Sequence, residues 1–174
     1  MDIVLELLKI ILPAGLVFLA SYMLMKNFLD NDRDRREAEN RRVTQSAITP
    51  LRLQAYERVV IFLERINPNT LVVRVNKQGI SAQQLHMELI KAIKSEYEHN
   101  LSQQIYMSYG AWELVKNAKE EILKLINISA TKVAHDAPGN DLAMMILNIT
   151  SGLGKKLPSE IAVDQIKKEV NQVF

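Results

Sequence analysis

Cysteine is missing from this chain of 174 residues, and glycine and proline are scarce, with six and five copies. Without cysteine there is no disulfide, no thiolate ligand for zinc and no thiol nucleophile. The phosphate-binding pattern G-x-x-x-x-G-K-[ST], the dinucleotide-binding pattern G-x-G-x-x-G and the nucleophile pattern G-x-S-x-G are absent as well. We therefore expect a protein that is not an enzyme and that binds no cofactor.

Histidine is also rare, and His86, His99 and His135 are each alone in their segments. Glu96 and His99 have the Glu-x-x-His spacing of carboxylate-bridged metal pairs in helical bundles. Such a site needs a second copy of the motif, which the sequence does not contain. We expect no metal site, and His99 at a helix end suits the helix dipole instead.

The chain also lacks a clear excess of positive or negative charge after its first 42 residues. Residues 43–174 carry 15 Lys and Arg against 13 Asp and Glu. A nucleic-acid-binding domain shows a clearly basic surface. This balance therefore excludes nucleic acid as an expected partner.

Long apolar runs are confined to the beginning of the chain. Ile10 to Met25 contains sixteen residues without a charge, and Ile3 to Met25 is interrupted only by Glu6 and Lys9. About 20 mostly apolar residues cross a bilayer, and basic residues collect on the cytoplasmic side. We predict a single-pass transmembrane anchor over residues 1–25, with its N-terminus outside. The charged residues expected at the membrane interface are Glu6, Lys9, Lys26, Arg33, Arg35 and Arg36.

A cleaved signal peptide is the alternative for this segment. Signal peptides begin with basic residues and end in small residues at the cleavage site. This chain begins with acidic Asp2 and Glu6, and no A-x-A pattern follows the apolar run. The sequence favours an anchor that is retained.

A charged stalk is predicted over residues 26–47. Residues 26–42 hold six basic and five acidic side chains, spaced so that opposite charges meet at i+3 and i+4. Such pairs stabilise a solvated helix by about 0.2–0.5 kcal/mol each. The alternative is a disordered charged linker.

Residues 48–174 predict a small cytoplasmic all-α domain. Thr49-Pro50 resembles a helix start, and apolar stripes then recur every three or four residues, as in Leu85, Leu89 and Ile93. Leu71 to Val75 is rich in β-branched valine and fits a helical turn or a strand. We favour the turn because no second strand is available. The predicted fold is a transmembrane helix, a helical stalk and a helical bundle.

Within the bundle the sequence also predicts two helix caps and one irregular connection. Ser81 with Gln84 fits a capping box. Residues 100–108 are expected to form an irregular connection, and Ser108 can cap a long helix that runs to about Val133.

One segment, residues 96–114, combines amides with aromatic rings. This combination makes either a hydrogen-bonded corner between helices or a surface that recognises a partner. The candidate partner-binding residues are Tyr97, Asn100, Gln103, Gln104, Tyr106, Tyr109 and Trp112.

The sequence resembles an uncharacterised family of short membrane-anchored proteins from Bacteroidota, known only as a domain of unknown function. The resemblance rests on ILPAG in the apolar segment, TPLRLQAYERVVIFLERINPN, EYEHNLSQQIYMSYGAWE and AKEEILKLIN. It covers nearly the whole chain. It implies a location in the bacterial inner membrane, and it implies no activity and no site residues.

Two classes of function remain open. We favour a membrane-anchored, non-catalytic scaffold or accessory subunit of a cytoplasmic-membrane assembly, with the bilayer and other membrane proteins or a second copy as partners. The alternative is a ligand-binding domain or an enzyme of unknown chemistry at the membrane surface.

Overall fold

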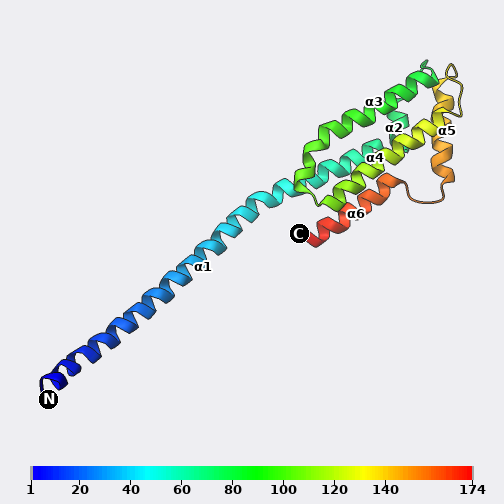
Figure 1. Cartoon of the computed structure of the whole chain (residues 1–174). Helices are drawn as coiled ribbons and strands as arrows, with labels where there is room; N and C mark the ends of the chain where they lie inside the picture. Colours follow the sequence, from blue (N-terminus) through cyan, green and yellow to red (C-terminus); the bar gives the residue numbers. More distant parts are fainter. Residues whose placement is uncertain (1, 174) are drawn as a thin grey trace. The chain divides into compact units, whose positions relative to one another are not determined.

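The computed structural model describes the backbone of residues 2–173 and the side chains of residues 13 and 15–172. Over this range the chain is all-α, as predicted, with a single isolated β-bridge between Ser81 and Pro138. The chain divides into two compact units, Met1–Thr49 and Pro50–Phe174. The elements in chain order are α1 (Asp2–Ile66), α2 (Pro68–Val75), α3 (Ala82–Asn100), η1 (Leu101–Tyr106), α4 (Tyr109–Ala130), α5 (Gly139–Gly152) and α6 (Pro158–Val173) (Figure 1).

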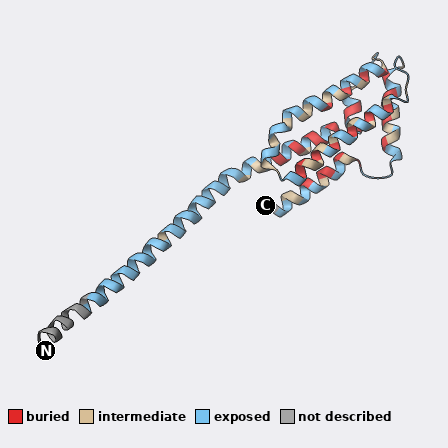
Figure 2. Ribbon diagram, viewed as in Figure 1, coloured by how far each residue is buried: buried red, intermediate tan, exposed pale blue. Residues whose placement is uncertain are grey.

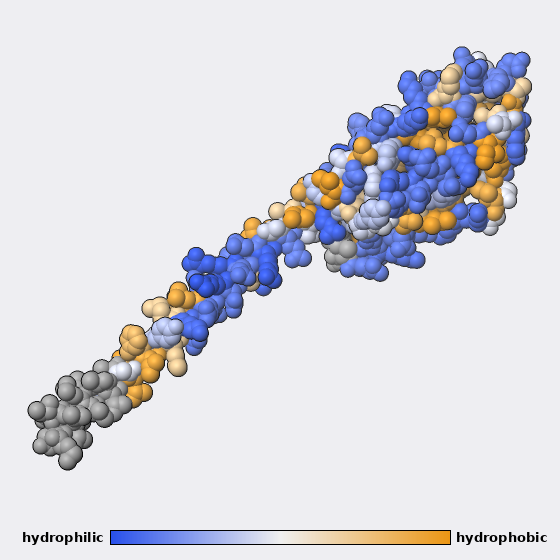
Figure 3. Space-filling model, viewed as in Figure 1, coloured by the Kyte–Doolittle hydropathy of each residue, from blue (hydrophilic) through white to orange (hydrophobic). Residues whose placement is uncertain are grey.

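The first unit consists of the N-terminal part of α1. Its side chains change from apolar to charged along the helix (Figure 3). Two of the predicted charge pairs are present, Arg36 to Asp32 at 2.9 Å and Arg41 to Glu37 at 3.6 Å. The prediction of a helix here, rather than a disordered linker, is confirmed.

The predicted anchor includes residues 1–12 and 14, whose side chains, among them Glu6 and Lys9, lie outside the described residues. Within the side chains that are described, no helix has a stretch long and apolar enough to cross a membrane. The predicted ranges 1–25, 26–47 and 48–174 stay predictions.

The predicted helix start at Thr49-Pro50 is wrong, because both residues have helical backbone within α1. Proline removes one backbone hydrogen bond inside a helix and leaves the carbonyl four residues earlier without its donor. Here that carbonyl belongs to Ser46, and both Ser46 and Pro50 are exposed. Water can therefore hydrate the carbonyl, and the helix tolerates the proline.

The second unit is a bundle with a continuous apolar core. Helix α4 packs against α3, α5 and α6, and α2 packs against α3 and α5. The buried faces of these helices point toward one another (Figure 2). Fully buried side chains come from all six α-helices and include Phe62, Leu71, Leu89, Ile122, Ile146 and Ile166.

Local capping signals fix the helix starts. The Asn67 side chain accepts a hydrogen bond from the Asn69 amide, and Ser81 with Gln84 forms the predicted capping box. Ser108 accepts a hydrogen bond from the Ala111 amide at the start of α4. The segment that could have been a strand is helical, so the prediction of a turn is confirmed.

Two connections differ from the prediction. The expected irregular segment 100–108 contains the 3₁₀ helix η1, and α4 ends at Ala130 rather than near Val133. At that end the Thr131 hydroxyl donates to the Ile128 carbonyl over 2.8 Å. This side-chain bond occupies a carbonyl of the last turn and accompanies the earlier stop.

Glycine is required where α5 begins. The Gly139 amide donates to the Ile80 carbonyl over 2.8 Å. A Cβ at residue 139 would lie 3.0 Å from that oxygen and from Cγ1 of Ile80. The close approach of these two backbones holds the loop before α3 against the start of α5.

Candidate functional site

The predicted site residues divide into a buried group and an exposed group. Tyr97 and Trp112 stack with their ring centroids 5.8 Å apart, and Tyr97 also contacts Phe62 at 6.0 Å. Trp112 is only 6% exposed. The ammonium of Lys119 lies 4.1 Å from the centre of the Tyr97 ring. These two predicted residues are brought together, with Trp112 in the core and Tyr97 partly buried against it.

Two amide side chains among the candidate residues form hydrogen bonds with nearby residues of the same chain segment. The Asn100 side chain donates to the Glu96 carbonyl over 2.8 Å, and the Gln103 side chain donates to the Ser102 hydroxyl over 3.2 Å. The Tyr106 carbonyl accepts from the Arg52 guanidinium at 3.2 Å. These bonds tie the end of α3 and η1 to their own turn and to α1. They show the arrangement expected of a corner between helices.

The remaining candidates are on the surface. Tyr109 is 81% exposed, and Gln104 is also exposed. Ile105, between the two predicted glutamines and Tyr106, is 73% exposed although it is apolar. The sequence prediction therefore combined residues with two different environments, and only Gln104 and Tyr109 are freely accessible to a partner.

A polar network that the sequence did not predict lies beside this corner. Glu169 of α6 accepts a hydrogen bond from the Tyr56 hydroxyl over 2.5 Å. The Ser108 amide donates to the same oxygen at 3.3 Å, and the other oxygen of Glu169 accepts from the Ser108 hydroxyl over 2.6 Å. One carboxylate therefore joins α1, the start of α4 and α6.

The pKa values of this network follow from burial and hydrogen bonding. Partial burial by itself raises the pKa of Glu169, but the hydrogen bonds from Ser108 and Tyr56 outweigh it, so the pKa lies below the ordinary value of 4.5. Burial raises the pKa of Tyr56, and its bond to Glu169 adds to the effect. At neutral pH the network therefore consists of a carboxylate and a neutral phenol.

Sequence signals for this network were weak. Ser108 was predicted as a helix cap, and a carboxylate near a helix start is favourable. However, Glu169 lies 61 residues from Ser108 and 113 from Tyr56. Only the packing of α6 against the rest of the bundle brings them together.

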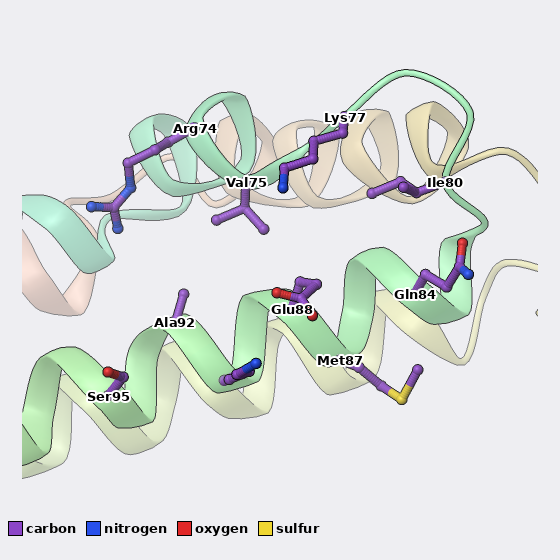
Figure 4. A pocket seen from close by; sticks show the side chains of 10 residues that line it. Arg74, Val75, Lys77, Ile80, Gln84, Met87, Glu88, Ala92 and Ser95 are labelled. Carbon is purple, nitrogen blue, oxygen red and sulfur yellow. The ribbon is translucent and has the colours of Figure 1, made fainter.

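A groove of about 610 Å³ lies between α3 and the segment formed by α2 and its following loop (Figure 4). Figure 4 shows Val75 directed toward α3 and Ala92 directed toward α2. The charged side chains that line this groove have both signs, with Lys77 and Lys91 beside Glu88. Arg74 is held by Glu96 at 3.5 Å and by the Arg65 carbonyl at 3.1 Å. This combination of signs selects no single class of ligand.

The glutamate of the Glu-x-x-His motif forms ion pairs with two arginines. Glu96 pairs with the Arg65 guanidinium at 2.7 Å as well as with Arg74. Among the side chains that the structure describes, no group of three or more His, Asp or Glu is arranged to hold a metal ion. The predicted interface residues Lys26, Arg33, Arg35 and Arg36 are exposed on α1.

Comparison with known proteins gives a family and no activity. No curated protein and no solved structure matches the chain. A family model does match, described as a family of unknown function (DUF7935), and it covers residues 2–173. Because the match extends over almost the entire sequence, the chain belongs to the DUF7935 family of unknown function.

Proposed function

We propose that this protein is a membrane-tethered, non-catalytic module of a bacterial cytoplasmic membrane. In this proposal the apolar beginning of α1 spans the bilayer once with its N-terminus outside, and the charged part of α1 forms the stalk. The bundle, residues 50–174, is the cytoplasmic part, which acts as a scaffold or accessory subunit of a membrane assembly.

One observation supports the proposed membrane tether. Ten large apolar side chains between Leu16 and Leu29 are 49–72% exposed. They include four consecutive residues, 16–19, so the apolar surface surrounds the helix. Apolar surface of this extent is costly in water at about 25 cal/mol per Å². Lipid would cover it on every side, and the charged residues that follow would stay in water.

The non-catalytic role is supported by how the polar corner is used. The Glu169 carboxylate accepts hydrogen bonds from two other segments, at Tyr56 and Ser108. Trp112 is part of the core, and the partly buried Tyr97 packs against it. The hydrogen bonds and packing of these side chains account for their positions, so no catalytic role is needed to explain them.

The tether predicts that the full chain stays with membranes. When it is expressed in a bacterial host, we expect it to float with membrane vesicles, to resist carbonate extraction and to be released by detergent. Replacing Leu16 and Leu19 with arginine should move it out of that fraction, because each arginine in the middle of a span costs about 2.5–3.5 kcal/mol.

The matched control places two arginines on exposed apolar residues of the bundle, Ile61 and Met144, and this variant should still float. A single cysteine at residue 144 in the otherwise cysteine-free chain tests the orientation. It should react with a membrane-impermeant maleimide only after lysis. Recovery of the unaltered chain without detergent, or labelling of intact cells, would contradict the proposal.

The surface proposed for a partner is the exposed part of the corner, Gln104, Ile105 and Tyr109. A photoreactive amino acid at residue 105 or 109 in native membranes should give a discrete crosslinked product with another membrane protein or a second copy. The same group at exposed Met144 should not. If products are absent at both corner positions, or equal at Met144, this surface is not the contact.

A further inference from the structure

A second groove, separate from the corner, lies between α4, α5 and α6 and has a volume of about 480 Å³. Its walls are mainly apolar and come from all three helices. The apolar lining consists of Leu114, Leu125, Ile128, Ile149, Leu153, Ile161 and Ala162. Ile128 and Ile161 remain substantially exposed within it. The bundle therefore leaves a strip of its apolar surface uncovered.

The groove is elongated. Along α4 its lining begins at Leu114 and ends at Ile128. At 1.5 Å rise per residue, these fourteen steps correspond to about 21 Å. A volume of this size lies within the range of small-molecule pockets, about 300–1,000 Å³. A stable protein interface needs about 800 Å² from each partner, which is more than a narrow groove offers.

The charges on the rim are predominantly positive. Lys124, Lys155 and Lys156 line the groove together with a single acid, Glu121. Lys124 lies 4.0 Å from Glu121, and Lys156 pairs with Asp164 at 2.5 Å. Lys155 makes no ion pair within the part of the chain that the structure describes. One cation is thus available where the loop after α5 enters the groove.

We propose that this groove binds a single-chain amphiphile with a carboxylate head group, a long-chain fatty acid. The acyl chain would lie along α4 and cover the exposed faces of Ile128 and Ile161. The carboxylate would lie against Lys155, in the loop between α5 and α6. This inference concerns the bundle alone and does not depend on the membrane tether.

Photocrosslinking tests the proposal on the full chain, kept in solution by an amphipathic polymer. The probe is a 16-carbon fatty acid with a diazirine in the chain, and labelled peptides are mapped by mass spectrometry. We expect adducts concentrated in residues 114–128 and 149–162, and competition by unlabelled palmitate but not by its methyl ester. Ile161→Trp should fill the groove and remove most of the labelling.

Lys155→Glu should lower labelling about fivefold, the effect of losing one partly exposed charge pair. Lys94→Glu, an exposed lysine on α3, is the matched control and should label normally. Far-UV circular dichroism confirms that each variant is folded. Adducts spread evenly over the chain, equal competition by the ester, or full labelling of Ile161→Trp would overturn the proposal. A crosslink from the groove to another protein in place of the acid would overturn it in favour of a protein ligand.

Discussion

Trp112→Ala is expected to lower the free energy of unfolding by about 3–5 kcal/mol, the cost of removing a large buried aromatic side chain. The indole is almost completely enclosed, and its ring stacks on Tyr97. Its removal leaves a cavity between α3 and α4 and also takes away the aromatic contact. Denaturant unfolding followed by far-UV circular dichroism measures the change.

Tyr109→Ala is the matched control, because it removes an aromatic ring from the same helix three residues earlier. That side chain is 81% exposed, and substitutions at such positions usually change stability by less than about 0.5 kcal/mol. The pair therefore separates the structural half of the corner from its surface half. Equal losses for the two variants would show that Tyr109 also packs, and would remove it from the proposed contact surface.

Glu169→Gln is expected to lower the free energy of unfolding at pH 7 by about 1.5–3 kcal/mol, the range for hydrogen bonds to a charged group. The carboxylate holds the Tyr56 hydroxyl and the Ser108 hydroxyl. The amide of glutamine carries no charge and has one acceptor oxygen where the carboxylate has two. Denaturant unfolding at a series of pH values measures the loss.

The difference between Glu169 and its glutamine variant should depend on pH. Because the pKa of Glu169 is lower in the folded state than its ordinary value of 4.5, ionisation stabilises the fold. That contribution is present in full above pH 4.5 and is lost as the pH falls through the lower, folded-state pKa. The two curves should therefore converge in acid.

Glu64→Gln is the control for this experiment. The side chain of Glu64 is exposed on α1, and its loss should change stability by less than about 0.5 kcal/mol at any pH. Other carboxyl groups with lowered pKa values, such as Asp164, titrate in both proteins and cancel from the difference. A constant difference across pH for Glu169→Gln would mean that its carboxylate does not stabilise the bundle.

The sequence predicted the features whose causes are local. The caps at Ser81 and Ser108 and the stripe of Leu85, Leu89 and Ile93 depend on residues within one or two turns of each other. The pattern at Thr49-Pro50 was also local, and it failed because Ser46 and Pro50 are exposed, so that water can hydrate the carbonyl that the proline leaves without a donor.

The site was harder to predict because its environment depends on packing. Trp112 and Tyr109 are three residues apart on one helix, yet one is in the core and the other in solvent. The spacing alone indicates which residues share a face, but the neighbouring helices decide which face is covered. The acceptor for Tyr56 and Ser108 comes from α6, and no short-range pattern points to it.

The carboxylate that joins three helices also constrains the order of folding during synthesis. Tyr56 and Glu169 are separated by 113 positions, so their contact cannot form until α6 has been translated and has left the ribosome. Until then the faces of α1 and α4 that α6 covers stay open, in a nascent chain whose other helices can already pair. During that interval a chaperone, or a second nascent copy, could bind the open faces of the bundle. The interval ends when α6 packs onto them.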